Sequence, residues 1–548
     1  MAEVKFVSEN KTVDVEAGTT VLEAARLAGM VIDSPCNGSG TCGKCRVFIS
    51  GTDNRNWKET KHCHLTQAEH SRGIVISCQC MVYGDVEVQF VQKGNEKLKI
   101  LSQGMETDID VAPRITKTYD AVNDETTVYS EKTALFVEPK NTVADKYGVA
   151  IDIGTTTLVA SLINLNDGCE LAVASGLNPQ ARYAQDVLSR IKLGSQPEGL
   201  NTLHGELIRE LNRLIADVAD SAHISVSSIY EAIFSGNTTM LHLSTHTDPA
   251  SLGKYPYRPV IRGNLYFEAA SIGLAIANNG AVYVPPVMSA YVGADITSGI
   301  LVTGLTHQNG TTLFVDIGTN GEMVLAVNGV LTATSTAAGP AFEGMNISCG
   351  MRAGSGAVES VVINDGNITL ETIGDIAPSG ICGSGLLDAV GELSAHGYID
   401  KNGRFITKGN DDKFRIQDEK AVFCLAENVY LSQKDIRQVQ LAKAAVRAGI
   451  ETMLTTNGIR ANQVDSVLIA GSFGYHLKAT SLFNIGLLPR DFEGRVKFVG
   501  NTSKSGARAF LVNNPVRDEA AKWVKSVRVI ELADDPQFEK TFIGALSF

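Results

Sequence analysis

The stretch Val149–Thr157, with the sequence VAIDIGTTT, decides how most of this chain folds. An apolar run leads into an aspartate and then into a turn of glycine and threonine, a pattern typical of a buried strand that ends at a ligand. Leu313–Glu322, with the sequence LFVDIGTNGE, repeats the same design. A second apolar strand follows each copy, over 158–165 and 323–330. The repeat predicts two similar α/β halves, and therefore a two-lobed fold with a cleft between the lobes.

Each of these turns is suited to holding phosphate, because backbone N–H groups and hydroxyls can donate to it and glycine lets the backbone come close. The predicted phosphate-holding residues are Gly154, Thr155, Thr156, Gly318, Thr319 and Asn320. Asp152 and Asp316, one behind each turn, are candidates for positioning Mg²⁺ through water, or for positioning the attacking water. Two ligand-free hairpin turns are the alternative, but the pairing of turn and apolar strand in both copies favours a nucleotide.

A third glycine turn follows the apolar strand Val467–Ala470 and has the sequence GSFG. Gly471, Ser472 and Gly474 are the candidates for contacts with adenosine, since glycine allows a ligand to lie against the backbone. A sharp strand-to-helix turn is the alternative for this segment taken alone. Its place after two phosphate turns favours adenosine.

Two further features predict packing rather than chemistry. His242 and His246 lie one helical turn apart, but no carboxylate or cysteine partner is evident, so we interpret them as ordinary helix residues. The segment Asp435–Leu454 has apolar residues near helical spacing and predicts an amphipathic helix.

The N-terminal region carries a different chemistry. Cys36, Cys42 and Cys45 form a C-x5-C-x2-C cluster in a glycine-rich loop, and Cys78 follows. Thiolates at this spacing favour an iron–sulfur cluster, and the remote fourth cysteine favours the [2Fe–2S] type. A zinc site is the alternative, but a zinc ribbon needs a second C-x-x-C pair.

The domain organisation follows from these motifs. Residues 1–91 predict a small β-rich unit with alternating strands and a helix that can use a threonine as its N-cap. Residues 92–146 are charged and turn-rich, and predict a partly ordered linker. The nucleotide-binding region covers 147–548, with lobes at about 147–308 and 309–548.

Composition excludes several classes of function. The 548 residues are 44% hydrophobic and carry a net charge of −12, which disfavours binding to nucleic acid and to anionic membranes. No apolar stretch is long enough for a transmembrane helix, and no secretory signal is visible. Ten cysteines without such a signal indicate a reducing cytoplasm, where clustered cysteines bind metal.

Taken together, these motifs resemble the reductive activators of corrinoid proteins. Besides the three turns and the cysteine cluster, the matching stretches include SGNTTM at 235–240, GAD at 293–295 and GICGSG at 380–385. The resemblance covers residues 1–91 and 147–548. It implies a multidomain α+β and α/β fold: a β-grasp, ferredoxin-like domain, a linker, and a two-lobed ATPase of the acetate and sugar kinase, Hsp70 and actin superfamily.

The resemblance also implies a function, the ATP-dependent one-electron reduction of inactive Co(II) to Co(I) in a corrinoid protein of a methyltransferase system. The implied cofactors are a [2Fe–2S] cluster, ATP and Mg²⁺, and the implied electron donor is a low-potential ferredoxin or flavodoxin. The fourth cluster cysteine of the family lies in a Cys-Gln pair, which selects Cys78 over its competitors Cys80 and Cys63. Relatives commonly have GGFG where this chain has Ser472, a mild departure that leaves the adenosine role intact.

Two other functions are compatible with the motifs. A kinase of a small metabolite with a redox-sensing ferredoxin domain would make a phosphorylated product. A nucleotide-gated ferredoxin that delivers electrons to a reductase would bind nucleotide with negligible turnover. The activators of radical dehydratases share the ATPase fold but use a [4Fe–4S] cluster between subunits, which the four N-terminal cysteines argue against. The oligomeric state stays open, with a homodimer as one candidate.

Overall fold

The computed structural model describes residues 1–7, 10–30, 32, 45–50, 56–59, 65, 67–91, 109–409, 411–417, 419–471 and 477–548. The chain forms two compact units. The smaller unit consists of Met1–Leu98 with the short segments Pro179–Arg190 and Ile416–Lys420, and the larger unit contains the rest.

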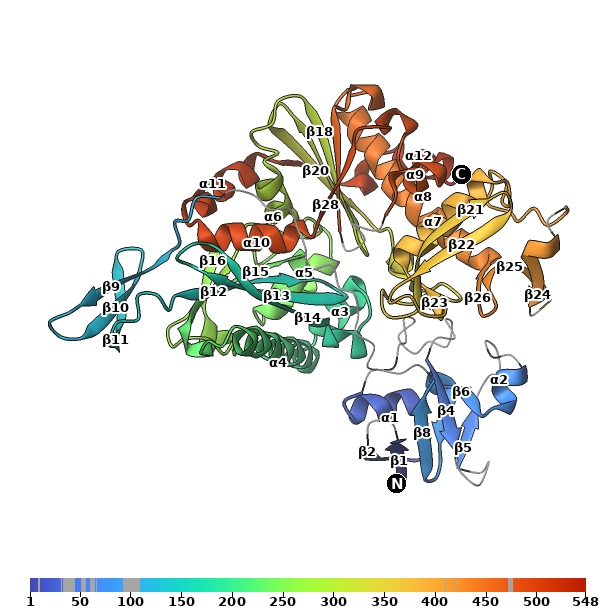
Figure 1. Cartoon of the computed structure of the whole chain (residues 1–548), viewed down its shortest axis with the longest axis horizontal. Helices are drawn as coiled ribbons and strands as arrows, with labels where there is room; N and C mark the ends of the chain where they lie inside the picture. Colours follow the sequence, from blue (N-terminus) through green and yellow to red (C-terminus); the bar gives the residue numbers. More distant parts are fainter. Residues whose placement is uncertain are drawn as a thin grey trace. The chain divides into compact units, whose positions relative to one another are not determined.

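The smaller unit has a five-stranded sheet of order β2-β1-β8-β4-β6 (Figure 1). The strands are β1 (Ala2–Phe6), β2 (Lys11–Val15), β4 (Arg46–Ser50), β6 (Ile74–Ile76) and β8 (Val86–Phe90). β1 and β2 form an antiparallel hairpin, whereas β1 and β8 run parallel. Helix α1 (Val21–Leu27) begins after Thr20, whose hydroxyl accepts a hydrogen bond from the Glu23 N–H at 3.1 Å. The β-grasp prediction and its threonine cap are confirmed.

Short elements complete this unit. They are β3 (Thr19–Thr20), β5 (Trp57–Glu59), β7 (Cys80–Val82), α2 (Gln67–Ser71) and the 3-10 turn η2 (Ser77–Gln79). Alternation places Val4 and Phe6 of β1 on the buried face, where they pack with Val47 and Val88. α1 packs against η2 and β7, so the helix closes the core over the cysteine-bearing turn.

The predicted linker contains a three-stranded antiparallel sheet. Its strands are β9 (Ile115–Asp120), β10 (Glu125–Ser130) and β11 (Thr133–Pro139). Ile115 and Val128 are buried in a cluster that includes Tyr230 of the larger unit. Lys117 Nζ donates to Glu138 Oε2 at 2.8 Å and to the Tyr230 hydroxyl at 2.7 Å. Residues 115–139 are therefore an ordered extension of the larger unit.

The first lobe is built on a six-stranded sheet of order β14-β13-β12-β15-β17-β16. The strands are β12 (Tyr147–Ile153), β13 (Thr157–Asn164), β14 (Glu170–Leu177), β15 (Ile229–Gly236), β16 (Leu265–Glu268) and β17 (Ala281–Val284). β12, β13 and β14 form an antiparallel meander, and β15 and β17 add to it in parallel.

The second lobe repeats this arrangement in a sheet of order β28-β27-β18-β19-β20-β29. The strands are β18 (Thr311–Ile317), β19 (Gly321–Val327), β20 (Val330–Thr336), β27 (Ser466–Ala470), β28 (Val496–Gly500) and β29 (Arg528–Val529). β18, β19 and β20 form the meander, and β27 and β28 add in parallel. The internal repeat predicted from the sequence is thus a repeat of sheet topology.

Helices and two small sheets cover these lobes. The helices are α3 (Val187–Gly194), α4 (Pro197–Ser221), α5 (Thr238–Ser244), α6 (Ala294–Thr303), α7 (Gly383–Ala395), α8 (Gln433–Thr456), α9 (Ala479–Asn484), α10 (Thr502–Val512), α11 (Pro515–Trp523) and α12 (Phe538–Gly544). The small sheets are β22-β21-β23 (Asn367–Thr372, Ala357–Asn364, Gly380–Ile381) and β24-β25-β26 (Phe414–Gln417, Lys420–Ala426, Val429–Ser432). The predicted helix over 435–454 is α8, which a Ser432–Asp435 capping box starts.

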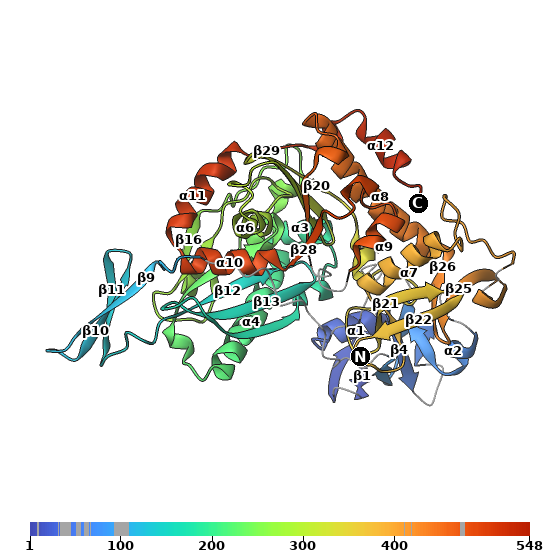
Figure 2. The ribbon, with the colours of Figure 1, turned by 45° about the horizontal axis from the view of Figure 1, so that its top comes forward.

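The C-terminal part of the chain contributes elements to both lobes in turn. α10 follows β28 of the second sheet but packs against α6, β12 and β15 of the first lobe (Figures 1 and 2). α11 is fixed to the first sheet by Arg517, which forms a bidentate ion pair with the buried Glu231 of β15 at 2.8 Å. β29 then pairs in parallel with β20 of the second sheet. In the parts of the chain that are described, no helix is long and apolar enough to cross a membrane.

Candidate functional site

The two predicted phosphate turns have the same construction. Each joins the first two strands of its sheet, and each is closed by a backbone hydrogen bond: Gly154 N to Thr157 O at 3.0 Å, and Gly318 N to Asn320 O at 2.9 Å. A Cβ at position 154 would lie 2.6 Å from the Thr157 carbonyl oxygen, so the first turn requires glycine. The threonine of each turn, Thr156 or Thr319, keeps partial exposure.

Side chains from neighbouring loops fix the first turn. The Asn178 amide donates to the Gly154 carbonyl at 2.8 Å, and the Asn237 amide donates to the Thr155 hydroxyl oxygen at 3.0 Å. Asn237 is also the N-cap of α5, where its side chain accepts from the Met240 N–H at 3.0 Å. The SGNTTM stretch therefore both begins a helix and holds the turn.

The aspartates behind the turns lie close enough to Asp295 and Glu322 for these carboxylates to influence one another's charge, and we call Asp152, Asp295, Asp316 and Glu322 the carboxylate cluster. Asp316 and Glu322 are cross-strand partners in β18 and β19, so their side chains share one face of the sheet. Asp295 lies in the first turn of α6. Asp295 and Glu322 were not among the predicted site residues, although the GAD stretch and the repeated strand contain them.

Desolvation raises the pKa of Asp316 to about 8, and the nearby charges of Asp295 and Asp152 add to the rise. Desolvation also raises the pKa of Asp295 to about 7, with the charge of Asp152 as a further cause. The pKa of Glu322 lies well above its usual value because the side chain is buried beside Asp295 and Asp316. Four carboxylates that disfavour one another's charge form a site that a cation would stabilise.

Asp152 is held by the chain that enters α10. Its Oδ1 accepts from the Ser503 hydroxyl at 2.7 Å, and its Oδ2 accepts from the Asn501 amide at 2.8 Å. Desolvation raises the pKa of Asp152, while these two hydrogen bonds oppose the rise. Ser503 also lies 2.9 Å from the Ser235 hydroxyl, which extends the network to β15.

A fifth carboxylate, Glu343, connects the two turns. It accepts one hydrogen bond from the Thr156 hydroxyl and one from the Thr319 hydroxyl. The structure thus brings together the two turns that the sequence placed far apart. Sequence reasoning missed Glu343, and the only local signal is its place between two glycines in the segment GPAFEG.

The third predicted turn begins beside the second phosphate turn. Gly471 has a φ of 114°, and a Cβ there would lie 2.3 Å from the Ile317 carbonyl oxygen and 3.2 Å from Asp316 Oδ1. Only glycine allows this approach. Ser472 and Gly474 lie outside the described residues.

Two of the predicted cluster cysteines, Cys45 and Cys78, are described, whereas Cys36, Cys42 and the competitor Cys63 lie outside the described residues. Cys45 immediately precedes β4, and Cys78 lies in η2 immediately after β6. β4 and β6 are antiparallel neighbours, which places both cysteines at the same end of the sheet.

The backbone links these two cysteine segments directly. The Ser77 N–H donates to the Cys45 carbonyl at 2.7 Å. Cys80, by contrast, begins β7 opposite Glu59, and burial followed by the charge of Glu59 raises the pKa of its thiol to about 12. The adjacent Cys45 and Cys78 segments are compatible with two ligands of one iron–sulfur cluster, whereas Cys80 lies in β7.

The two histidines do not form a metal site. His242 lies in α5, where its Nδ1 bonds the Thr238 carbonyl at 2.7 Å and its Nε2 accepts from the Val260 N–H at 3.0 Å. His246 lies beyond the end of α5, with a φ of 54°, and its Nε2 is 2.7 Å from Asn201 Oδ1. The prediction of a helix position is right for His242 and wrong for His246. Across the described ranges, no three His, Cys, Asp or Glu side chains converge as direct ligands of one metal ion.

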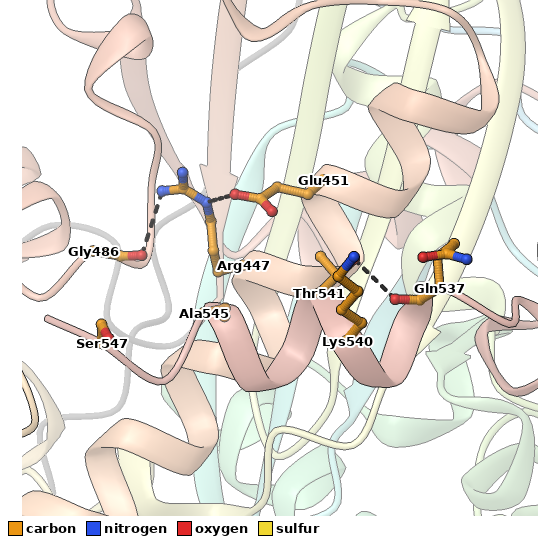
Figure 3. A pocket seen from close by; sticks show the side chains of 9 residues that line it. Arg447, Glu451, Gly486, Gln537, Lys540, Thr541, Ala545 and Ser547 are labelled. Carbon is orange, nitrogen blue, oxygen red and sulfur yellow. Dashed lines mark hydrogen bonds and ion pairs between the residues drawn. The ribbon is translucent and has the colours of Figure 1, made fainter.

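A polar pocket of about 490 Å³ lies elsewhere in the larger unit, between α8 and α12 (Figure 3). Arg447 in its wall pairs with Glu451 at 2.6 Å and donates to the Gly486 carbonyl at 3.4 Å. None of its lining residues belongs to the turns or to the carboxylate cluster.

Three sequence families match the chain. Residues 5–83 match the 2Fe-2S iron-sulfur cluster binding domain, residues 147–308 match the RACo middle region, and residues 310–548 match the C-terminal domain of RACo, the ASKHA domain. These matches agree with the ferredoxin-like fold of the smaller unit and with the repeated sheets of the larger one.

Individual relatives match over most of the chain. The corrinoid activation enzyme RamQ of Eubacterium limosum is 30% identical over 98% of this chain and 98% of its own. The [Co(II) methylated amine-specific corrinoid protein] reductase of Methanosarcina barkeri is 25% identical over 73% of this chain and 77% of its own. A solved structure, the reductive activator for corrinoid,iron-sulfur protein, is 30% identical, with a TM-score of 0.75 over 100% of this chain and 98% of its own.

Proposed function

Because the chain belongs to the family of corrinoid-activating enzymes, we propose that it uses ATP to drive the one-electron reduction of an inactive Co(II) corrinoid protein to Co(I). The observation that carries this function is the meeting of two phosphate turns, through Glu343, in a chain that also contains a ferredoxin-like domain. The turns supply a place for ATP, and the ferredoxin-like domain supplies a path for one electron.

The energetics of the electron transfer explain why one chain combines an ATP site with a ferredoxin-like domain. A plant-type [2Fe–2S] centre has a potential of about −400 mV. For a one-electron step, each gap of about 59 mV makes the equilibrium tenfold less favourable. A Co(II) acceptor that lies about 100–200 mV lower would therefore need about 2–5 kcal/mol. ATP can provide this amount if its binding and hydrolysis act differently on two conformations of the protein.

The ATP site is assigned as follows. The residues 154–156 and 318–320 hold the phosphates, and the backbone at Gly471, together with Ser472 and Gly474, lies against adenosine. Asp152 and Asp316 position Mg²⁺ or the attacking water. The mutual repulsion within the carboxylate cluster supports a bound cation, and contact through water is consistent with Mg²⁺, which keeps several of its waters.

The electron path is assigned to the smaller unit. Cys36, Cys42, Cys45 and Cys78 hold the [2Fe–2S] cluster, which when bound accepts and passes on one electron at a time. The hydrogen bond from Ser77 to Cys45 keeps the two described cysteine segments together. A low-potential ferredoxin or flavodoxin is the proposed electron donor, and a homodimer is the proposed assembly.

The conformational element is the pair of lobes. Asp152 belongs to the first lobe and Asp316 to the second, so a nucleotide that contacts both turns favours their closed arrangement. Hydrolysis removes one of the bridged phosphates and releases that preference. We assign to this motion the control of the corrinoid protein's binding or of its cobalt ligation.

A single experiment tests the coupling. The chain, the Co(II) corrinoid protein and a low-potential donor are mixed anaerobically, and the Co(I) absorbance is followed with ATP, with a non-hydrolysable ATP analogue and without nucleotide. We expect Co(I) to accumulate with ATP, together with free phosphate. Equal Co(I) formation under all three conditions would refute the coupling. A phosphorylated metabolite would indicate a kinase, and nucleotide binding without turnover would indicate a gated ferredoxin.

A further inference from the structure

Glu343 occupies a position that the assigned ATP site leaves without a role. Its carboxylate accepts the hydroxyl proton of Thr156 from the first phosphate turn and that of Thr319 from the second. The two threonines belong to different lobes, so a single side chain contacts the site from both sides.

The backbone fixes Glu343 in this place. It ends a short 3-10 turn, η7 (Pro340–Glu343), which lies between Gly339 and Gly344. Both glycines have positive φ, 77° and 75°, and a Cβ at position 344 would lie 2.5 Å from the Met351 carbonyl oxygen. The turn therefore depends on glycine at its end.

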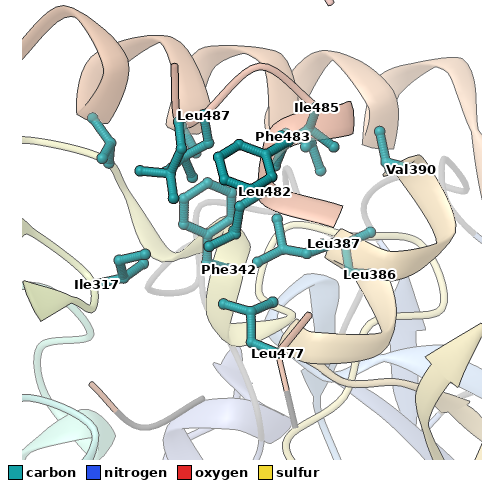
Figure 4. Close-up of a cluster of buried hydrophobic side chains, with 14 of the residues drawn as sticks. Ile317, Phe342, Leu386, Leu387, Val390, Leu477, Leu482, Phe483, Ile485 and Leu487 are labelled. Atoms are coloured by element: carbon teal, nitrogen blue, oxygen red, sulfur yellow. The ribbon is translucent and has the colours of Figure 1, made fainter. Parts of the chain in front are cut away.

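Packing adds a second constraint. Phe342, next to Glu343, is fully buried in the core of the second lobe, where it lies with Leu386, Leu387 and Leu482 (Figure 4). The same core contains Ile317, the last residue of β18 before the second phosphate turn. Glu343 and Thr319 are thus carried by segments that share one rigid core.

The direction of these hydrogen bonds determines what the hydroxyls can do. A threonine hydroxyl has one proton and two lone pairs. When its proton is donated to Glu343, the hydroxyl can only accept from a ligand in the site. Phosphate oxygens only accept hydrogen bonds, whereas a water molecule can also donate them. At these two hydroxyls the arrangement is therefore suited to holding a water, and contacts to phosphate are left to the other donors of the turns.

The other carboxylates of the site are engaged differently. Asp152 accepts from Asn501 and Ser503, and Asp295 accepts from the Ile296 N–H at 2.9 Å. Asp316 and Glu322 lie on the strands behind the second turn. Among the residues that the structure describes, Glu343 is the carboxylate that bonds to both turns.

We propose that Glu343 takes up, through the hydroxyl of Thr156 or Thr319, the proton that the attacking water loses when ATP is hydrolysed. This inference rests on the proposed ATPase function. Glu343 acts through the hydroxyls, so it is a positioning residue for the water and the final acceptor of its proton.

The proposed step is balanced in atoms and electrons. The water oxygen forms a bond to the γ-phosphorus, and the bond between the γ-phosphorus and the bridging oxygen breaks, with its electron pair going to ADP. The water proton moves to the threonine oxygen while the threonine proton moves to Glu343, which later releases it to solvent. Such proton transfer by a positioned side chain contributes about 10²–10⁴-fold to a rate.

The test separates hydrolysis from binding, using the full chain with its corrinoid protein. Single-turnover ATP hydrolysis gives the rate of the chemical step, and equilibrium binding of a non-hydrolysable ATP analogue gives the affinity. We expect Glu343→Gln to slow hydrolysis by about 100-fold while changing the affinity by less than about threefold. Glu371→Gln, at an exposed carboxylate of β22, is the matched control and should change neither.

Glu343→Asp serves as a second variant if the glutamine variant does not fold. It keeps a carboxylate on a shorter side chain, so its hydrolysis rate should fall between those of the wild type and Glu343→Gln. An unchanged single-turnover rate in both variants overturns the inference. If the variants bind the analogue more tightly but hydrolyse ATP at an unchanged rate, Glu343 competes with phosphate for the site. If the variants no longer bind the analogue, Glu343 has a structural role. Either outcome also overturns the inference.

Failure of the proposed function gives a different result. If the wild type binds the analogue but releases no phosphate in the presence of its corrinoid protein, the proposed ATPase function is refuted, and the role of Glu343 with it. If the wild type hydrolyses ATP and both variants do so equally fast, only the role of Glu343 is refuted.

Discussion

The side-chain amide of Asn501 donates a hydrogen bond to Oδ2 of Asp152 at 2.8 Å, although 349 positions separate the two residues. Asn501 follows β28 and is also the N-cap of α10, where its Oδ1 accepts from the Lys504 N–H at 2.9 Å. One asparagine therefore begins a helix and holds the aspartate of the first phosphate turn.

Asn501→Asp tests this second role, because aspartate is as good an N-cap as asparagine. The new carboxylate cannot donate to Asp152 and adds a like charge beside it. We expect kcat/KM for ATP hydrolysis to fall by at least about tenfold, which corresponds to about 1.4 kcal/mol. Asn501→Ser keeps a capping oxygen without the charge and should have a smaller effect. Equal activity in the aspartate variant and the wild type would contradict the prediction.

The fourth cluster ligand can be decided by a pair of serine variants. Cys78 lies in the turn that is hydrogen-bonded to the Cys45 segment, whereas Cys80 is buried in β7 with a raised thiol pKa. We expect Cys78→Ser to lose or strongly shift the visible absorbance of the iron–sulfur cluster, and Cys80→Ser to retain it. Cys42→Ser should also bleach the spectrum. The reverse pattern for positions 78 and 80 would refute the assignment.

The carboxylate cluster predicts how stability depends on pH in the absence of nucleotide and metal. The pKa of Asp316 is about 8 in the folded protein, against about 3.9 in an unfolded chain. Between these values the folded state binds more protons than the unfolded state, so stability decreases as the pH rises. Asp295, with a pKa of about 7, contributes in the same direction.

This dependence can be measured as the melting temperature in EDTA between about pH 6 and pH 8.5, the range in which Asp316 loses its proton. The wild type should melt at lower temperature as the pH rises. Asp316→Asn removes one titrating group and should flatten the curve. Parallel curves for the two proteins would show that Asp316 does not titrate in this range.

The buried pair of Glu231 and Arg517 predicts a large effect on stability. Arg517→Met removes the bidentate partner of the buried Glu231 and leaves it with Arg114 at 3.3 Å, so the cost should approach that of breaking a buried ion pair, about 3–5 kcal/mol. Glu231→Gln combined with Arg517→Met should be less destabilising than Arg517→Met alone. Urea unfolding measures the difference. Arg213→Met, in an exposed ion pair of α4, is the control and should cost less than about 1 kcal/mol.

The sequence repeat predicted two similar lobes because the first strands of their sheets carry the same apolar run, aspartate and glycine turn. Glu322 could have been found as well, since it lies opposite Asp316 in the hairpin that the turn defines. Glu343 could not, because its place depends on a 3-10 turn and on the core around Phe342. Local periodicity contains no information about either.

Two other features of the structure could not be predicted from the local sequence pattern. The sheet β9–β11 has short strands rich in threonine and charged residues, and it is ordered by contacts of Ile115, Lys117 and Val128 with the first lobe. The packing of α10 on the first sheet joins residues from opposite ends of the ATPase region. Both depend on tertiary contacts that a single-sequence pattern does not encode.

α10 and α11 pack on the first lobe and β29 pairs with the second, although all three follow the second lobe's first strands in the sequence. This arrangement limits how the two halves of the region could be separated or recombined. A gene segment that encodes residues 147–308 lacks the helices that cover β12 and pair with Glu231, and the segment that follows encodes them. Recombination near position 308 would therefore combine the first lobe with an α10 and α11 from another protein, and these helices would still have to pack on the sheet that contains β12 and β15. The two sheets repeat one topology, but because α10 and α11 pack on the first lobe, neither half contains all the helices that its own sheet needs.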